Sequence, residues 1–210
     1  MATAHTGKPA PVSGEFRPRT SVLLAGFIWL LAAAAAVSTL ASGVDGWRGL
    51  PFAAALAFIG YWLFWYPVVR LDADAVLLRN PVRRISVPWD ALIQVDTKYA
   101  LTLVTTKGSF AAWAAPAPGA LGAFRAKASD AQDLPATSYG AGGSMRPGDL
   151  KNSDSGAAAQ LVRTHWAALA EAGALNVDAT ETATATIRYN WALIGAAVVL
   201  AVAVAASATI

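Results

Sequence analysis

The residues best suited to chemistry in this sequence are basic side chains around a predicted turn at Asn80 and Pro81. Three arginines flank the turn, and two lysines are candidates for the same edge of the fold, which gives the set Arg79, Arg83, Arg84, Lys98 and Lys107. Near a membrane, each basic residue contributes about 1 kcal/mol of attraction to anionic lipid headgroups. The set is therefore a candidate site for headgroups or for a partner protein. Basic residues also fix the orientation of membrane proteins, and that role accounts for the same arginines.

Residues that support catalysis or metal binding are scarce. The sequence has no cysteine, which excludes disulfides, thiolate metal sites and cysteine nucleophiles. Its histidines, His5 and His165, are far apart in the chain, whereas a metal site needs several ligands together. No serine–histidine–acid set or phosphate-binding loop is apparent. We therefore expect a protein that is not an enzyme and that carries no cofactor and no metal.

Three apolar runs without charged residues dominate the rest of the chain, at residues 22–41, 50–69 and 191–210. Each is about 20 residues long, enough for a helix to cross the hydrocarbon core of a bilayer. Only 14% of all residues are charged, against about 25% in an ordinary soluble domain. We therefore predict three transmembrane helices. The first run also has features of a cleaved signal peptide, and any apolar run is compatible with a buried core helix.

The basic residues near the ends of these runs indicate an orientation. Lys8, Arg17 and Arg19 precede the first run, four arginines follow the second, and Arg188 precedes the third. Because Lys and Arg accumulate on the cytoplasmic side, the tail of residues 1–21 and the segment 71–190 are expected in the cytoplasm. The predicted location is the plasma membrane, with the C-terminus outside.

The segment 71–190 has the pattern of a small antiparallel β domain. Alternating apolar residues predict strands at about 71–78, 85–87, 92–98, 99–105 and 109–114. Asp72 and Asp74 are expected on an exposed face of the first strand. Residues 129–155 are rich in Asp, Ser, Gly and Pro and predict a mobile insert. A helix is expected at 156–172, capped by Asp154 or Ser155 and ended by Gly173, with a possible last strand at 176–187.

A set of apolar residues recurs at strand and helix spacing and is predicted to form the domain core. Its members are Trp89, Leu101, Leu103, Trp113 and Trp166. Buried aromatic rings of this kind contribute much of the apolar area of a small core.

Several motifs resemble a known family. They are the string from Leu78 to Trp89, Leu-Arg-Asn-Pro-Val-Arg-Arg-Ile-Ser-Val-Pro-Trp, followed by Asp96, by the Leu-Thr-Leu of residues 101–103, by Gly108 and by Trp113 after Ala112. Together with five strands and a closing helix, they resemble the bacterial pleckstrin-homology (PH) domain of actinobacterial membrane proteins, the group of low molecular weight protein antigen 6. The resemblance covers residues 50–114 best. It implies a PH-like domain anchored by membrane helices that precede it.

Three functions are compatible with this organisation. The first is a non-enzymatic, membrane-anchored module that binds a protein partner at the inner face of the plasma membrane. The second is an accessory subunit of a larger membrane complex, held through its helices, whose alanine-rich runs allow close helix approach. The third is binding of anionic lipid headgroups. A net charge of +3 is too small to argue for nucleic acid.

Overall fold

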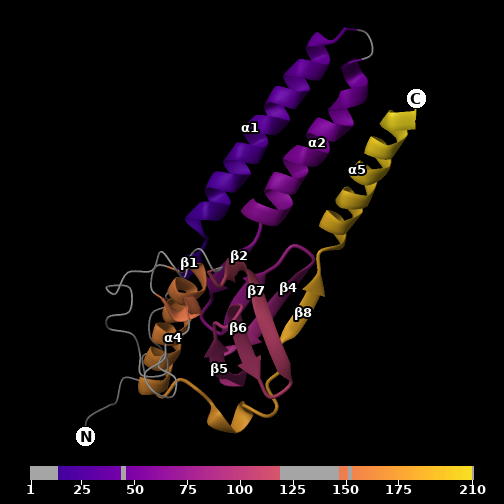
Figure 1. Ribbon diagram of the computed structural model, residues 1–210. Helices are drawn as coiled ribbons and strands as arrows, with labels where there is room; N and C mark the ends of the chain where they lie inside the picture. Colours follow the sequence, from indigo (N-terminus) through magenta and orange to yellow (C-terminus); the bar gives the residue numbers. More distant parts are fainter. Residues whose placement is uncertain (1–13, 44–45, 119–146, 151–152, 210) are drawn as a thin grey trace, which may run out of the picture.

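The molecule has two parts, a group of apolar helices and a β domain attached to one end of that group (Figure 1). The computed structural model describes residues 14–43, 46–118, 147–150 and 153–209. Helices α1 (Arg19–Ala41) and α2 (Leu50–Ile59) form an antiparallel hairpin, and α5 (Trp191–Thr209) lies beside α2. The domain ends of all three helices lie on the same side, where the β domain begins (Figure 1).

The second apolar run differs from the expected single helix of residues 50–69. Helix α2 has 10 residues and continues as the 6-residue π-helix η2 (Gly60–Trp65), after which Val68 and Val69 belong to a strand. At about 1.5 Å per residue these helical segments span at most about 24 Å, less than the roughly 30 Å hydrocarbon core. Within the described part of the chain, only α1 and α5 are long and apolar enough to cross a membrane on their own. The prediction of three equivalent full-length spans is therefore wrong: two helices reach that length, and the helical part of the second apolar run is shorter.

The helical hairpin is closed by an aromatic contact at the change from α-helix to π-helix. The Trp29 indole nitrogen donates to the Ala57 carbonyl over 3.0 Å, and its ring packs on Trp65 with centroids 5.4 Å apart. A Cβ at Gly60 would lie 3.0 Å from the Trp29 ring nitrogen, so this position favours glycine.

The β domain consists of two antiparallel sheets. The five-stranded sheet has the order β1-β2-β3-β4-β8, and the three-stranded sheet has the order β5-β6-β7. Their bounds are β1 (Gly14–Phe16), β2 (Val68–Leu71), β3 (Ala75–Arg79), β4 (Arg83–Pro88), β5 (Leu92–Asp96), β6 (Ala100–Thr105), β7 (Gly108–Pro116) and β8 (Thr186–Tyr189).

The strands differ from the prediction in three places. The run 71–78 is split into β2 and β3 by a tight turn, in which the Asp72 amide donates to the Ala75 carbonyl over 2.9 Å. Asp72 and Asp74 therefore lie in or beside a turn and not on a strand face. Residues 14–16 of the expected N-terminal tail form β1, which pairs with β2. The stretch 176–187 forms a strand only from Thr186, and it continues to Tyr189.

Helix α4 (Asp154–Glu171) closes the domain. Its N-cap is Ser153, whose hydroxyl accepts the Gly156 amide over 2.9 Å, and not Asp154 or Ser155. Gly173 follows the helix with a φ of +64°, the left-handed conformation expected of its C-cap. Most of the predicted mobile insert of residues 129–155, at 129–146 and 151–152, lies outside the described residues. Its described end is packed: Asp149, only 5% exposed, accepts hydrogen bonds from Thr97 over 2.8 Å and Arg163 over 3.0 Å.

Most of the residues predicted for the domain core are buried there, and one is not. Trp89, Leu101 and Leu103 are buried, and Trp166 is partly buried against the same cluster. Trp113 is 56% exposed, because the alternation of β7 turns Ala112 and Ala114 inward and Trp113 outward. Its indole contacts the helical part of the protein instead, as described below.

This difference gives a test of the core. Replacing Leu103 with Ala removes a fully buried side chain and should lower the free energy of unfolding by about 2–5 kcal/mol. Replacing Trp113 with Ala removes an outward ring and should cost less. Chemical denaturation of the full-length protein in detergent measures both. A loss for Trp113→Ala as large as that for Leu103→Ala would mean that the register of β7 is wrong.

Candidate functional site

The most distinctive charged feature is a row of arginines across the outer face of the five-stranded sheet. In the strand register, Arg79 of β3 is directly opposite Arg84 of β4, and Arg84 is directly opposite Arg188 of β8. Residues paired in this way lie on the same face of a sheet. We call Arg79, Arg84 and Arg188 the arginine row. It crosses the end of the sheet nearest the helices, since Arg188 lies only three residues before α5 begins.

Like charges directly opposite each other destabilise a sheet, so the partners of the arginine row matter. The Arg84 Nε atom donates to the Tyr66 hydroxyl over 2.6 Å, and the guanidinium groups of Arg79 and Arg84 lie 5.3 and 5.7 Å from the Tyr66 ring centre. The Arg79 Nε atom is buried and finds no acceptor in the part of the chain that the structure describes. Among the described residues, no carboxylate forms an ion pair with any member of the row.

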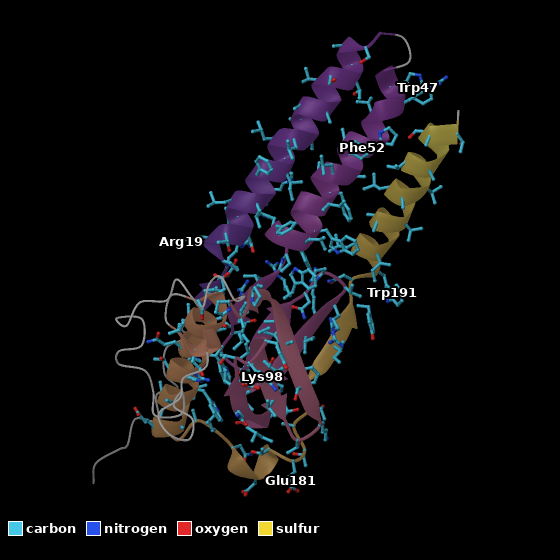
Figure 2. The ribbon with its side chains drawn as sticks, viewed as in Figure 1. Arg19, Trp47, Phe52, Lys98, Glu181 and Trp191 are labelled. Atoms are coloured by element: carbon cyan, nitrogen blue, oxygen red, sulfur yellow. The ribbon has the colours of Figure 1, made fainter. Side chains whose placement is uncertain are left out.

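The other predicted site residues are not part of this row. Arg83 alternates with Arg84 along β4 and lines a cavity on the other side of the sheet. Lys98 lies in the turn between β5 and β6, where its ammonium group is 5.0 Å from the Tyr99 ring centre. Lys107 lies in the turn between β6 and β7, next to Thr106, which donates to the Thr180 carbonyl over 3.4 Å. Figure 2 shows the neighbouring Glu181 at the end of the domain away from the helices.

Arg188 was not predicted as a site residue. The sequence places it just before an apolar run, which suggested only a role in orientation. Its position beside Arg84 depends on the pairing of β4 with β8, two strands separated by about 100 residues of chain. No local pattern specifies such a pairing.

The junction between the helices and the domain is held by side-chain donors that bind backbone carbonyls. The Trp62 indole donates to the Pro81 carbonyl over 3.0 Å, and the Trp113 indole donates to the Leu63 carbonyl over 2.9 Å. The Asn190 amide donates to the carbonyls of Asn80 and Pro81 over 3.0 and 3.1 Å. Its oxygen accepts the Tyr66 hydroxyl over 3.1 Å. The domain is therefore fixed to the helices from both sides.

A cavity of about 770 Å³ lies at this junction. Its walls come from the start of α1, from η2, from the turn between β3 and β4, and from β7, with Arg83 and Asp154 as its charged residues. Burial raises the pKa of the Asp154 carboxyl above its usual range, and the hydrogen bond from Thr20 opposes that shift.

A second hollow, of about 820 Å³, lies between the edge strand β5 and helix α4. Its apolar walls include Ile93, which is 47% exposed, and Trp166. The Trp166 indole nitrogen is buried and has no hydrogen-bond acceptor among the described residues. Arg163, on the same wall, donates to the Val95 carbonyl of β5 over 2.8 Å. We call this hollow the β5–α4 groove.

The described residues contain no group of three or more His, Asp or Glu side chains placed to hold a metal ion.

Residues 66–165 match the model of the bacterial PH domain family. Two antiparallel sheets closed by a helix agree with that match, so this segment is a PH-like domain, a class of generally non-catalytic interaction modules. The match ends within α4 and includes neither β8 nor α5. No curated protein and no solved structure matches the chain.

The hydrogen bonds of Asn190 at the junction lead to a testable prediction. Asn190→Asp keeps the shape of the side chain but removes the two N–H donors to Asn80 and Pro81. The Pro81 carbonyl keeps the Trp62 indole as a donor. The Asn80 carbonyl loses its side-chain donor, at a cost of about 1–3 kcal/mol, so the turn at 80–83 should open more often. Amide hydrogen exchange of the full-length protein should show faster exchange there. Asn176→Asp, at an exposed site, is the control. Unchanged exchange in Asn190→Asp would show that this contact does not hold the junction.

Proposed function

We propose that this protein is a non-enzymatic, membrane-anchored module whose PH-like domain binds a protein partner at the inner face of the plasma membrane. The match to a family of interaction modules supports this proposal. The motifs around Asn80–Pro81 and Trp89 further suggest the actinobacterial, low molecular weight protein antigen 6-like group.

Membrane insertion of all three helices with the domain inside the cell is part of the proposal. Helices α1 and α5 have the length and apolarity to cross a bilayer. The shorter segment of α2 and η2 lies between them and has no charged residue. The arginine row and Arg83 lie where the domain joins the helices, and basic residues favour the cytoplasmic side. The odd number of helices then places the C-terminus outside.

The main observation in favour of partner binding is the β5–α4 groove. It combines an edge strand, an exposed Ile93 and a buried indole N–H without an acceptor. An extended peptide that adds to a sheet edge supplies backbone carbonyls as acceptors and places alternate side chains in an adjoining groove. Asp154 at the start of α4 contacts Thr20 at the start of α1, so the groove, on the later part of α4, is directed away from the membrane. A cytoplasmic partner therefore has access to it.

Reporter fusions test the orientation. Alkaline phosphatase, which is active only outside the cytoplasm, should be active when fused after Ile210 and inactive when inserted within residues 129–146. The same fusions made with a reporter that works only in the cytoplasm should give the reverse pattern. Activity of phosphatase at the internal site would contradict the proposed orientation.

Site-specific crosslinking in living cells tests the groove. A photoreactive residue at Ile93 should form a defined adduct with one protein, whereas the same residue at Lys107, exposed on a distant turn, should not. Trp166→Phe replaces the indole with a smaller aromatic ring that has no N–H. The yield of the Ile93 adduct should fall several-fold, because an acceptor in the partner loses its donor. Adducts of equal yield at both positions, or an Ile93 adduct insensitive to Trp166→Phe, would rule out the groove as the partner site.

A further inference from the structure

Two small cavities adjoin the arginine row at the start of α5. One, of about 370 Å³, is lined by Arg84, Arg188 and residues 189–193. The other, of about 390 Å³, is lined by Leu77, Arg84, Ser86, Thr186 and Arg188. Arg84 and Arg188 belong to both cavities, and neither cavity has a carboxylate among its lining residues.

The uncompensated charge at this point is the first argument for a ligand. The Arg84 guanidinium uses Nε to contact Tyr66, and no hydrogen bond to a described residue engages its terminal nitrogens. The Arg188 side chain is exposed and makes no hydrogen bond or ion pair to any described residue. Guanidinium groups bind phosphate oxygens through paired, charge-assisted hydrogen bonds, so two adjacent groups form a phosphate-sized clamp.

The backbone and the hydroxyl groups add further donors. The helix dipole of α5 places partial positive charge at its first turn. Residues Trp191–Leu193 of this turn line the first cavity. Asn190, the residue before the helix, directs its side-chain oxygen to Tyr66 and its amide nitrogen to Asn80 and Pro81. The hydroxyls of Ser86 and Thr186, paired across β4 and β8, line the second cavity. The Asn190 side chain is therefore engaged away from the cavity, whereas the first turn of α5 and the two hydroxyls favour an anion.

From these contacts we infer that Arg84, Arg188 and the start of α5 form a binding site for a phosphate group, with Arg79 adding positive charge beside it. The site lies where α5 leaves the domain, which in an inserted protein is the level of lipid headgroups. Arg188 and the start of α5 lie beyond the segment that matches the PH family, and the site is separate from the β5–α4 groove. A lipid headgroup and a free phosphorylated molecule present the same chemistry.

The test uses full-length protein in neutral detergent and native mass spectrometry to measure bound adducts. The probes are phosphatidic acid, inorganic phosphate, and diacylglycerol as the matching lipid without phosphate. Arg84→Gln and Arg188→Gln should each weaken binding of the phosphate-bearing probe by about tenfold or more, because a charge-assisted contact is lost. Arg83→Gln removes the same charge from the opposite face of β4 and should leave binding nearly unchanged. Since the Arg188 side chain makes no hydrogen bond or ion pair with described residues, its variant should keep the thermal stability of the native protein.

The probes distinguish the two sources of phosphate. Retention of phosphatidic acid without inorganic phosphate assigns the site to a lipid, and binding of both assigns it to the phosphate group itself. The proposal is overturned if diacylglycerol binds as well as phosphatidic acid and inorganic phosphate does not bind. It is also overturned if Arg83→Gln weakens binding as much as Arg188→Gln does.

Discussion

The constraint on which the rest of the structure depends is the need to satisfy backbone carbonyls where the chain passes between helices and sheet. At this junction the π-helix η2, the turn at Asn80–Pro81 and the start of α5 come together, and none of them can satisfy all its own backbone groups. The indoles of Trp62 and Trp113 and the amide of Asn190 supply the donors. The Pro81 carbonyl has two of these donors, Trp62 and Asn190, and the Leu63 carbonyl has the Trp113 indole. A buried carbonyl left unpaired costs more than the bond itself contributes. The same contacts therefore bind the two parts of the molecule into one unit.

The positions of both candidate sites follow from that attachment. Because Asn190 fixes the start of α5 against the turn at Asn80–Pro81, β8 is held beside β4 and Arg188 beside Arg84. The resulting repulsion between like charges is tolerated partly because the Tyr66 ring lies against Arg79 and Arg84. The β5–α4 groove, in contrast, is directed away from the helices. The proposed anion site thus lies at the end of the domain next to the helices, and the proposed partner groove lies on the part away from them.

Sequence patterns predicted the helices and strands whose formation depends on residues close together in the chain. The apolar runs gave α1 and α5, the alternation of residues gave β4 to β7 nearly to their ends, and Gly173 marked the end of α4. The errors arose where tertiary contacts decide. Apolarity alone did not reveal that Gly60 begins a π-helix against Trp29, or that Trp113 is turned outward to bind Leu63. Of the candidate site, the sequence identified Arg79 and Arg84 but grouped them with Arg83, which strand alternation places on the other face.

The central claim is that helices and domain form one rigid unit, and a distance measurement tests it most directly. The sequence has no cysteine, so spin labels can be attached at Val199→Cys on α5 and Ser109→Cys on β7, both exposed positions. Pulsed electron–electron double resonance on the protein in lipid nanodiscs then reports the distribution of distances between the two labels. The account predicts a single narrow distribution, because the junction leaves the domain no freedom to swing. A broad or multimodal distribution would show that the domain moves independently of the helices and would contradict the account.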